Sequence, residues 1–163
     1  MTDKILESFL SVQYEQAQAL AAASDILFLA PEGEMPPQRN LARFHCRGLI
    51  KTPSGEIREE SQFDFGIQLP DDYLRSPDPK QVVTLFRPWS IFHPNALGPF
   101  ICPGKLVGGT PLVDIIYQIF EIVTYQKWAA HDGLNPAACE WARGNQHRFP
   151  IDRRPLKWRA PKP

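Results

Sequence analysis

The sequence predicts a single α+β domain: an N-terminal helix, a four-stranded antiparallel meander, a long loop and then C-terminal helices. Three observations predict this order. Apolar residues recur at helical spacing near the start of the chain, several strand patterns follow one another without helices between them, and a capped apolar helix begins only after a long stretch without periodicity. The chain of 163 residues is the size of one domain with one core.

Composition excludes several classes of function. Lys+Arg and Asp+Glu both number 18, so the formal net charge is zero, which argues against a general nucleic-acid binder. No apolar run is long enough to span a bilayer, and the N-terminus lacks the layout of a secretory signal, so we expect no membrane partner. The cysteines Cys46, Cys102 and Cys139 are odd in number and contain no Cys-x-x-Cys, which favours a reducing cytoplasm and predicts no metal site.

The first predicted element is a helix from Thr2 to Leu29, with Thr2 or Asp3 as its cap. Its stop is the turn at Ala30–Gly33. Ile26–Leu29 is unbroken apolar sequence, which fits either a buried helix end or a short strand. The helix is defined by apolar positions near helical spacing: Ile5, Leu6, Phe9, Leu10, Val12, Ala17, Leu20 and Ala21.

Strands are predicted next. Leu41–Ile50 is expected to form the first, and Thr52–Gly55 is a turn. Gln62–Leu69 alternates polar and apolar residues with period two, which is typical of a half-buried strand, and Gln81–Phe86 forms a further strand. Because no helix separates them, an antiparallel meander is the simplest topology.

Two helices follow a loop from Trp89 to Gly109. Thr110 is expected to cap the first helix, with Pro111 at its first position. After a turn, a last helix is expected to open at Asn135 or Pro136 and to end near Gly144. We expect a domain over residues 1–150 and a basic, proline-rich, solvated tail over residues 151–163.

Of the three cysteines, Cys102 is the one whose position in the sequence suggests a chemical role. It lies at the end of the long loop and ahead of a capped helix, where backbone on both sides can hold an exposed thiol. Cys46 and Cys139 fall in a strand and a helix pattern, as is typical of buried cysteines. The same loop contains the turn His93-Pro94-Asn95, which by itself fits an ordinary proline turn equally well.

Taken together, the stretch His93–Cys102 and the dipeptide Thr110-Pro111 resemble the ubiquitin-conjugating enzyme family. That family has a His-Pro-Asn turn, then a Gly, then Ile-Cys, then a Ser/Thr-Pro helix start. The resemblance extends to the hairpin turn at Thr52–Gly55, to the strand end and turn at Phe65–Tyr73, and to the acidic turn at Asp132–Pro136.

The resemblance implies a ubiquitin-conjugating-like fold and a carrier mechanism without a cofactor. An activating enzyme would pass a ubiquitin-like modifier to Cys102 as a thioester, and a target lysine or other amine would then accept it. Asn95 would order the loop and donate to the oxyanion, and Asp132 would position or deprotonate the attacking lysine. The loop would be supported by His93, Pro94 and Gly98, the histidine ring bonding backbone within the turn.

Some positions depart from the family pattern. Pro103-Gly104 stands where the family often has Leu-Asp, and Gly109 replaces the Trp that commonly precedes Ser/Thr-Pro. Lys4 is the only basic residue of the first helix, whereas eukaryotic members use several to dock their activating enzyme. These departures indicate a divergent prokaryotic member, of the kind found in bacterial antiviral-defence operons.

Two other functions stay open. A catalytically inactive ubiquitin-conjugating-like module would bind partners without chemistry, although the inactive variants lack the cysteine. A cysteine hydrolase would pair Cys102 with His93 or His131, and it requires a histidine within hydrogen-bond reach of the thiol. No hydrolase motif is present in the sequence.

Overall fold

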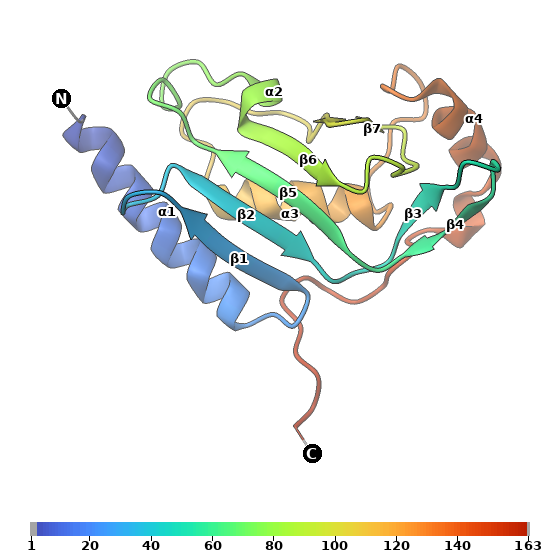
Figure 1. The fold of residues 1–163 in the computed structure, drawn as a ribbon, viewed down its shortest axis with the longest axis horizontal. Helices are drawn as coiled ribbons and strands as arrows, with labels where there is room; N and C mark the ends of the chain where they lie inside the picture. Colours follow the sequence, from blue (N-terminus) through green and yellow to red (C-terminus); the bar gives the residue numbers. More distant parts are fainter. Residues whose placement is uncertain (1–2, 163) are drawn as a thin grey trace.

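The computed structural model describes residues 3–162, and it shows an α+β domain with helices α1 and α3 packed on one antiparallel sheet (Figure 1). The sheet has four strands in the order β1-β2-β5-β6, and all its pairs are antiparallel. The N-terminal helix, the four-stranded antiparallel sheet and the C-terminal helices predicted from sequence are thereby confirmed. The bounds of these elements are α1 Lys4–Ala22, β1 Leu27–Glu32, β2 Arg39–Phe44, β5 Phe63–Gln68, β6 Val83–Arg87, α3 Leu112–Val123 and α4 Pro136–Gly144.

Smaller elements are inserted between these. A hairpin of two short strands separates β2 from β5, and Thr52–Gly55 turns between them as predicted. A second hairpin of two-residue strands lies within the long loop, where no element was predicted. The bounds are β3 Gly48–Lys51, β4 Ile57–Glu60, α2 Pro79–Val82, β7 Ala96–Leu97, β8 Phe100–Ile101 and a 3₁₀ turn at Gln146–Arg148.

The core lies between the sheet and the two helices. Period-two alternation in β5 sends Phe63, Phe65 and Ile67 to this side, where all three are fully buried with the apolar stripe of α3. On the opposite face Asp64 is almost completely buried and is held by Arg43 at 2.8 Å and by Arg87 at 2.6 Å. Two charge-assisted hydrogen-bond partners compensate for the burial of this carboxylate.

The apolar stretch Ile26–Leu29, which fitted a helix end or a short strand, lies mostly in the strand β1, and β1 also includes most of the turn predicted at Ala30–Gly33. The first helix therefore ends seven residues earlier than predicted, at Ala22. Its N-terminal cap is Asp3, whose side chain accepts from the Ile5 N–H at 2.9 Å, while Thr2 lies outside the described residues. The helix stops because the Ser24 hydroxyl accepts from the N–H groups of Ile26 and Leu27, both at 3.1 Å, and offers the backbone an alternative to helix.

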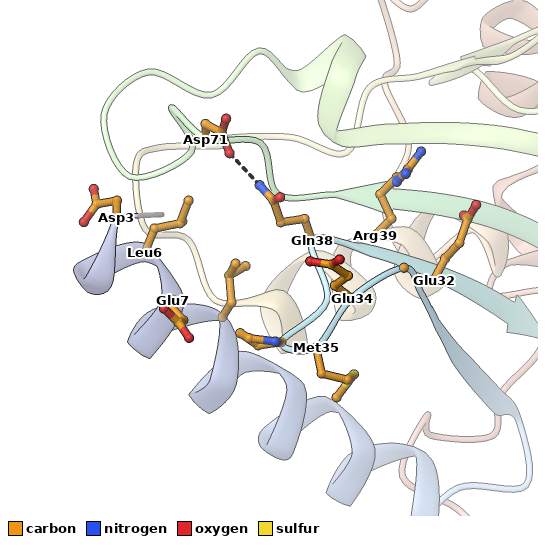
Figure 2. Close-up of a pocket in the computed structure, with 12 residues that line it drawn as sticks. Asp3, Leu6, Glu7, Glu32, Glu34, Met35, Gln38, Arg39 and Asp71 are labelled. Carbon is orange, nitrogen blue, oxygen red and sulfur yellow. Dashed lines mark hydrogen bonds between the residues drawn. The ribbon is translucent and has the colours of Figure 1, made fainter. Parts of the chain in front are cut away.

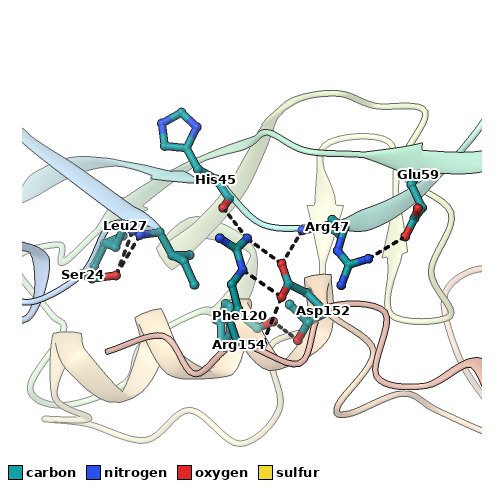
Figure 3. Close-up of polar contacts among 10 residues, drawn as sticks. Ser24, Leu27, His45, Arg47, Glu59, Phe120, Asp152 and Arg154 are labelled. Atoms are coloured by element: carbon teal, nitrogen blue, oxygen red, sulfur yellow. Dashed lines mark hydrogen bonds and ion pairs between the residues drawn. The ribbon is translucent and has the colours of Figure 1, made fainter. Parts of the chain in front are cut away.

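The strand predicted over Leu41–Ile50 is two strands, because the chain bends between Phe44 and Gly48. Figure 3 shows what holds the bend: the buried carboxylate of Asp152 accepts from the Arg47 N–H at 2.9 Å, and Arg154 donates to the carbonyl of His45. At Gly48 a side chain would meet the Phe63 ring at 2.7 Å, so only glycine fits this bend without displacement.

The cap of α3 is also not the predicted one. Pro111, and not Thr110, is the N-cap residue, and the Thr110 hydroxyl is bonded to the backbone of Val107. The first N–H of the helix is satisfied instead by the side chain of Gln13, whose Oε1 accepts from Leu112 N at 2.8 Å. A buried residue of α1 therefore caps α3 across the core.

In the C-terminal part of the chain the last helix agrees with the prediction, whereas the tail predicted over residues 151–163 does not. Helix α4 begins at Pro136, with Asn135 as the cap whose side chain accepts from Ala138 N, and it ends at Gly144 as predicted. The expected solvated tail is instead attached to the domain: Leu156 is buried in the main core. Among residues 3–162, no helix has both the length and the apolar character needed to cross a membrane.

Candidate active site

Cys102 is exposed, whereas Cys46 and Cys139 are buried, as their sequence patterns indicated. Cys102 follows directly on the β7–β8 hairpin, in which Ala96 pairs with Ile101. The hairpin turn has Gly98 at its first central position with φ +59°, a backbone conformation that glycine adopts without strain. The Pro99 carbonyl accepts from Leu85 N at 2.9 Å, so β6 holds the hairpin in place.

Asn95 contacts Cys102 through the backbone and through its side chain. The Cys102 N–H donates to the Asn95 carbonyl at 2.8 Å, and Asn95 Nδ2 donates to the Cys102 carbonyl at 3.4 Å. The other end of the amide is oriented by Ala129, whose N–H donates to Asn95 Oδ1 at 2.9 Å. Because an amide nitrogen carries two hydrogens, one N–H remains beyond the bond to Cys102.

His93 is 1% exposed and organises the turn from inside. Its Nδ1 accepts from Asn95 N at 2.9 Å, and its Nε2 lies 3.1 Å from the carbonyl of Lys127. The two contacts together require the neutral ring with the proton on Nε2. Burial lowers the pKa of His93 from its ordinary 6.5 to about 3, while the contact with the Lys127 carbonyl opposes this shift.

Asp132 lies on a turn that packs against the same loop. The Asn135 N–H donates to the carbonyl of Pro94 at 3.2 Å, and a side chain at Gly133 would meet that carbonyl at 2.5 Å. Asp132 itself is exposed and has φ +57°, which is uncommon for a non-glycine residue. Its carboxylate makes no hydrogen bond or ion pair within residues 3–162.

The structure thus joins Asn95 directly to Cys102 and places Asp132 on a turn bonded to Pro94. His131 is exposed, and its Nδ1 lies 3.5 Å from the guanidinium of Arg143. Sequence reasoning missed the backbone groups of Lys127 and Ala129, which orient His93 and Asn95. No sequence signal identifies them, because every residue carries the same carbonyl and every non-proline residue the same N–H.

Of two surface cavities, one borders the candidate site and the other lies away from it. A cavity of about 340 Å³ borders the β7–β8 hairpin and is lined by Trp89, Leu97 and Lys51 among others. A larger one of about 630 Å³ lies between the start of α1 and the β1–β2 turn (Figure 2). Its lining contains five carboxylates and one guanidinium, from Asp3, Glu7, Glu32, Glu34, Asp71 and Arg39. None of the predicted site residues lines this larger cavity.

The side chains offer no assembled metal centre in the part of the chain that the structure describes, since no three His, Cys, Asp or Glu residues there are grouped to hold an ion. No protein-family model matches this chain, and no curated protein matches it either.

Proposed function

We propose that this chain is a carrier enzyme of the ubiquitin-conjugating type, with a ubiquitin-conjugating-like fold, which accepts a ubiquitin-like modifier as a thioester on Cys102. The observation that carries the proposal is the pair of hydrogen bonds between Asn95 and Cys102. They bind the backbone of Cys102, whose side chain is exposed, to a residue whose side-chain amide is already oriented at its other end by Ala129. A preorganised donor next to a nucleophile is what acyl transfer requires.

In the loading step the Cys102 thiolate attacks the thioester carbonyl that links the modifier to the activating enzyme. A carbon–sulfur bond to Cys102 forms, and the carbon–sulfur bond to the activating enzyme breaks, releasing that enzyme's cysteine as thiolate. The proton lost by Cys102 passes to water. The remaining N–H of Asn95 supplies a donor for the oxyanion, and one such donor contributes about 3 kcal/mol to transition-state stabilisation.

In the discharge step a target amine attacks the thioester on Cys102. An amide bond forms, Cys102 leaves as thiolate and the amine loses a proton. A free lysine with pKa about 10.4 is mostly protonated at neutral pH, so a group that orients the neutral amine or accepts its proton accelerates the reaction. Asp132 fits this role because its carboxylate is exposed, has no bond among residues 3–162 and lies on a turn bonded to Pro94.

The geometry favours this function over a cysteine hydrolase. A hydrolase needs a ring nitrogen in contact with the thiol, and within residues 3–162 neither His93 nor His131 bonds to Cys102. Both ring nitrogens of His93 are already engaged, one by the Asn95 N–H and the other by the Lys127 carbonyl. A general base also needs a pKa near the working pH, and burial places that of His93 at about 3.

The pathway we propose is a bacterial conjugation pathway of the antiviral-defence type. It rests on the family resemblance and on the departures at Pro103, Gly104 and Gly109. The partners are an activating enzyme, a ubiquitin-like modifier and a target amine. The exposed residues Trp89 and Leu97, beside the 340 Å³ cavity, are available to contact one of them.

Loading tests the proposal. The chain is incubated with ATP and with the activating enzyme and modifier encoded beside its gene, and the products are separated with and without reductant. We expect wild type to form an adduct that reductant removes. Cys102→Ser should form no adduct that is sensitive to reductant. If no adduct appears with those partners, the catalytically inactive binding module becomes the better description.

A further inference from the structure

Tyr125 stands out by its backbone. It lies two residues beyond the end of α3 at Val123, and its φ of +62° makes it one of two non-glycine residues in the described chain, 3–162, with positive φ; the other is Asp132. At Tyr125 this conformation is the ordinary left-handed end of a helix, because the Tyr125 N–H donates to the Ile122 carbonyl at 3.0 Å and the Gln126 N–H donates to the Glu121 carbonyl at 2.8 Å. Glycine or asparagine usually takes this position, so a buried tyrosine here points to a role for its side chain. Tyr125 and Asp132 both lie in the segment that packs against the His93–Asn95 turn.

The side-chain contacts of Tyr125 reach the turn that contains Asn95. Its side chain is 2% exposed, and its hydroxyl donates to the backbone carbonyl of Phe92. Its ring lies against the ring of His93, with centroids 4.3 Å apart, and is stacked on Phe149 on another side at 4.5 Å. The side chain of Tyr125 thus contacts Phe92 and His93, the two residues that precede Pro94-Asn95.

These contacts lead to Asn95 by two routes. Along the first, Tyr125 packs on His93, and His93 Nδ1 accepts from the Asn95 N–H. Along the second, the left-handed backbone at Tyr125 turns the chain out of α3. The following residues then present the Lys127 carbonyl to His93 and the Ala129 N–H to Asn95 Oδ1. Tyr125 is the residue common to both routes.

We propose that Tyr125 is a positioning residue for the catalytic loop: its hydroxyl, its ring and the left-handed turn of its backbone set the orientation of Asn95 relative to Cys102. The proposal rests on the proposed carrier function for its catalytic consequence, but its structural part does not. Tyr125 touches neither the thiol nor a substrate. It acts through Phe92 and His93 on the amide that faces the reacting carbonyl.

The test removes one oxygen atom with Tyr125→Phe and measures three things. Discharge of loaded modifier to free lysine should slow about five- to tenfold, the effect of losing one buried hydrogen bond that orients a donor. Loading should slow by a similar factor, because the Asn95 amide also supplies the oxyanion donor in that step. Hydrogen exchange of the Asn95 and Cys102 N–H groups should become faster, and this readout needs no partner protein.

The matched control is Tyr73→Phe. Tyr73 is also fully buried, and its hydroxyl also donates to a backbone carbonyl, that of Thr110. It should leave exchange at Asn95 and the discharge rate unchanged. The buried thiol of Cys46 reports on folding, because general loosening of the protein exposes it to alkylation, whereas a local change at Tyr125 does not.

Unchanged exchange at Asn95 and Cys102 in a folded Tyr125→Phe protein overturns the structural part of the proposal. Faster exchange with unchanged discharge overturns the catalytic part. Equal slowing of discharge by both tyrosine variants, or alkylation of Cys46 in Tyr125→Phe alone, overturns the positioning role in favour of a general effect on stability. If the wild-type chain cannot be loaded, the carrier function fails, and the exchange measurement still decides the structural part.

Discussion

The buried ring of His93 predicts how the stability of the fold depends on pH. The folded protein keeps the ring neutral, with a pKa of about 3, whereas the unfolded chain has the ordinary value of 6.5. Between these two values the unfolded state binds one proton more than the folded state. The free energy of unfolding therefore rises with pH in this window and falls as the pH is lowered below about 6.5.

The size of the effect follows from the two pKa values. Between pH 7 and pH 5 His93 is protonated in the unfolded chain but not in the folded protein. This difference lowers the free energy of unfolding by about 2 kcal/mol. Urea unfolding followed by tryptophan fluorescence at pH 7 and pH 5 measures this difference. His93→Gln should lower the stability at pH 7, but it should remove about 2 kcal/mol of the pH dependence.

The exposed His131 offers the control, since His131→Gln removes a histidine that is not part of the buried turn. The comparison is between the pH-dependent change in unfolding free energy of wild type and that of each variant. Titratable groups that both proteins share contribute equally to the two changes and cancel. A His93→Gln protein that keeps the wild-type difference between pH 7 and pH 5 would show that the ring is not held neutral by burial.

Three further predictions concern other residues. Asp132→Ala should leave loading of Cys102 nearly intact and slow discharge to lysine on the order of 100-fold, as measured in single-turnover assays; equal loss of loading would make Asp132 a structural residue. Gln13→Met should destabilise the fold by about 1–3 kcal/mol in urea, because the buried Leu112 N–H loses its acceptor, whereas Gln16→Met on the exposed side of α1 should not; similar values for both would refute the capping role. Asp152 is held by Arg154 and by the Arg47 N–H, which lower its pKa from 3.8 to about 2 despite its burial. Its contribution of about 2 kcal/mol should be present above about pH 4 and should be lost as the pH falls towards 2. Asp152→Asn should therefore differ from wild type at pH 7 and converge with it in acid, and an equal difference at both pH values would contradict this.

The parts of the fold that sequence predicted are those set by local pattern. Asp3 caps α1 and Asn135 caps α4 because a short polar side chain before a helix satisfies its own neighbours' N–H groups. The strand at Phe63–Gln68 follows from period-two alternation, since one of its faces is buried under helices and the other is not. These signals need no knowledge of the rest of the chain.

The parts that sequence missed are set by partners distant in the chain. Gln13 caps α3 from 99 residues away, and Ser24 ends α1 while also donating to the carbonyl of Leu156. Asp152 holds the bend that separates β2 from β3. A local window of sequence contains none of these pairs, so propensity and periodicity placed these elements but not these particular ends.

The candidate site shows the same division. Cys102, Asn95 and His93 could be selected from sequence because their residue types and spacing resemble a known pattern. Tyr125 could not be selected, because its contribution depends on a left-handed backbone and on contacts with residues distant in the chain. Its hydroxyl, for example, donates to Phe92, which lies 33 positions earlier.

Intact mass spectrometry with peptide mapping tests the carrier function most directly. After incubation with ATP, activating enzyme and modifier, the wild-type chain should carry one modifier, lost on treatment with reductant and mapped to Cys102. Cys46→Ala and Cys139→Ala should load like wild type, because both thiols are buried. A reductant-labile adduct that persists in Cys102→Ser, or that maps to another cysteine, would contradict the assignment of Cys102 as the carrier thiol.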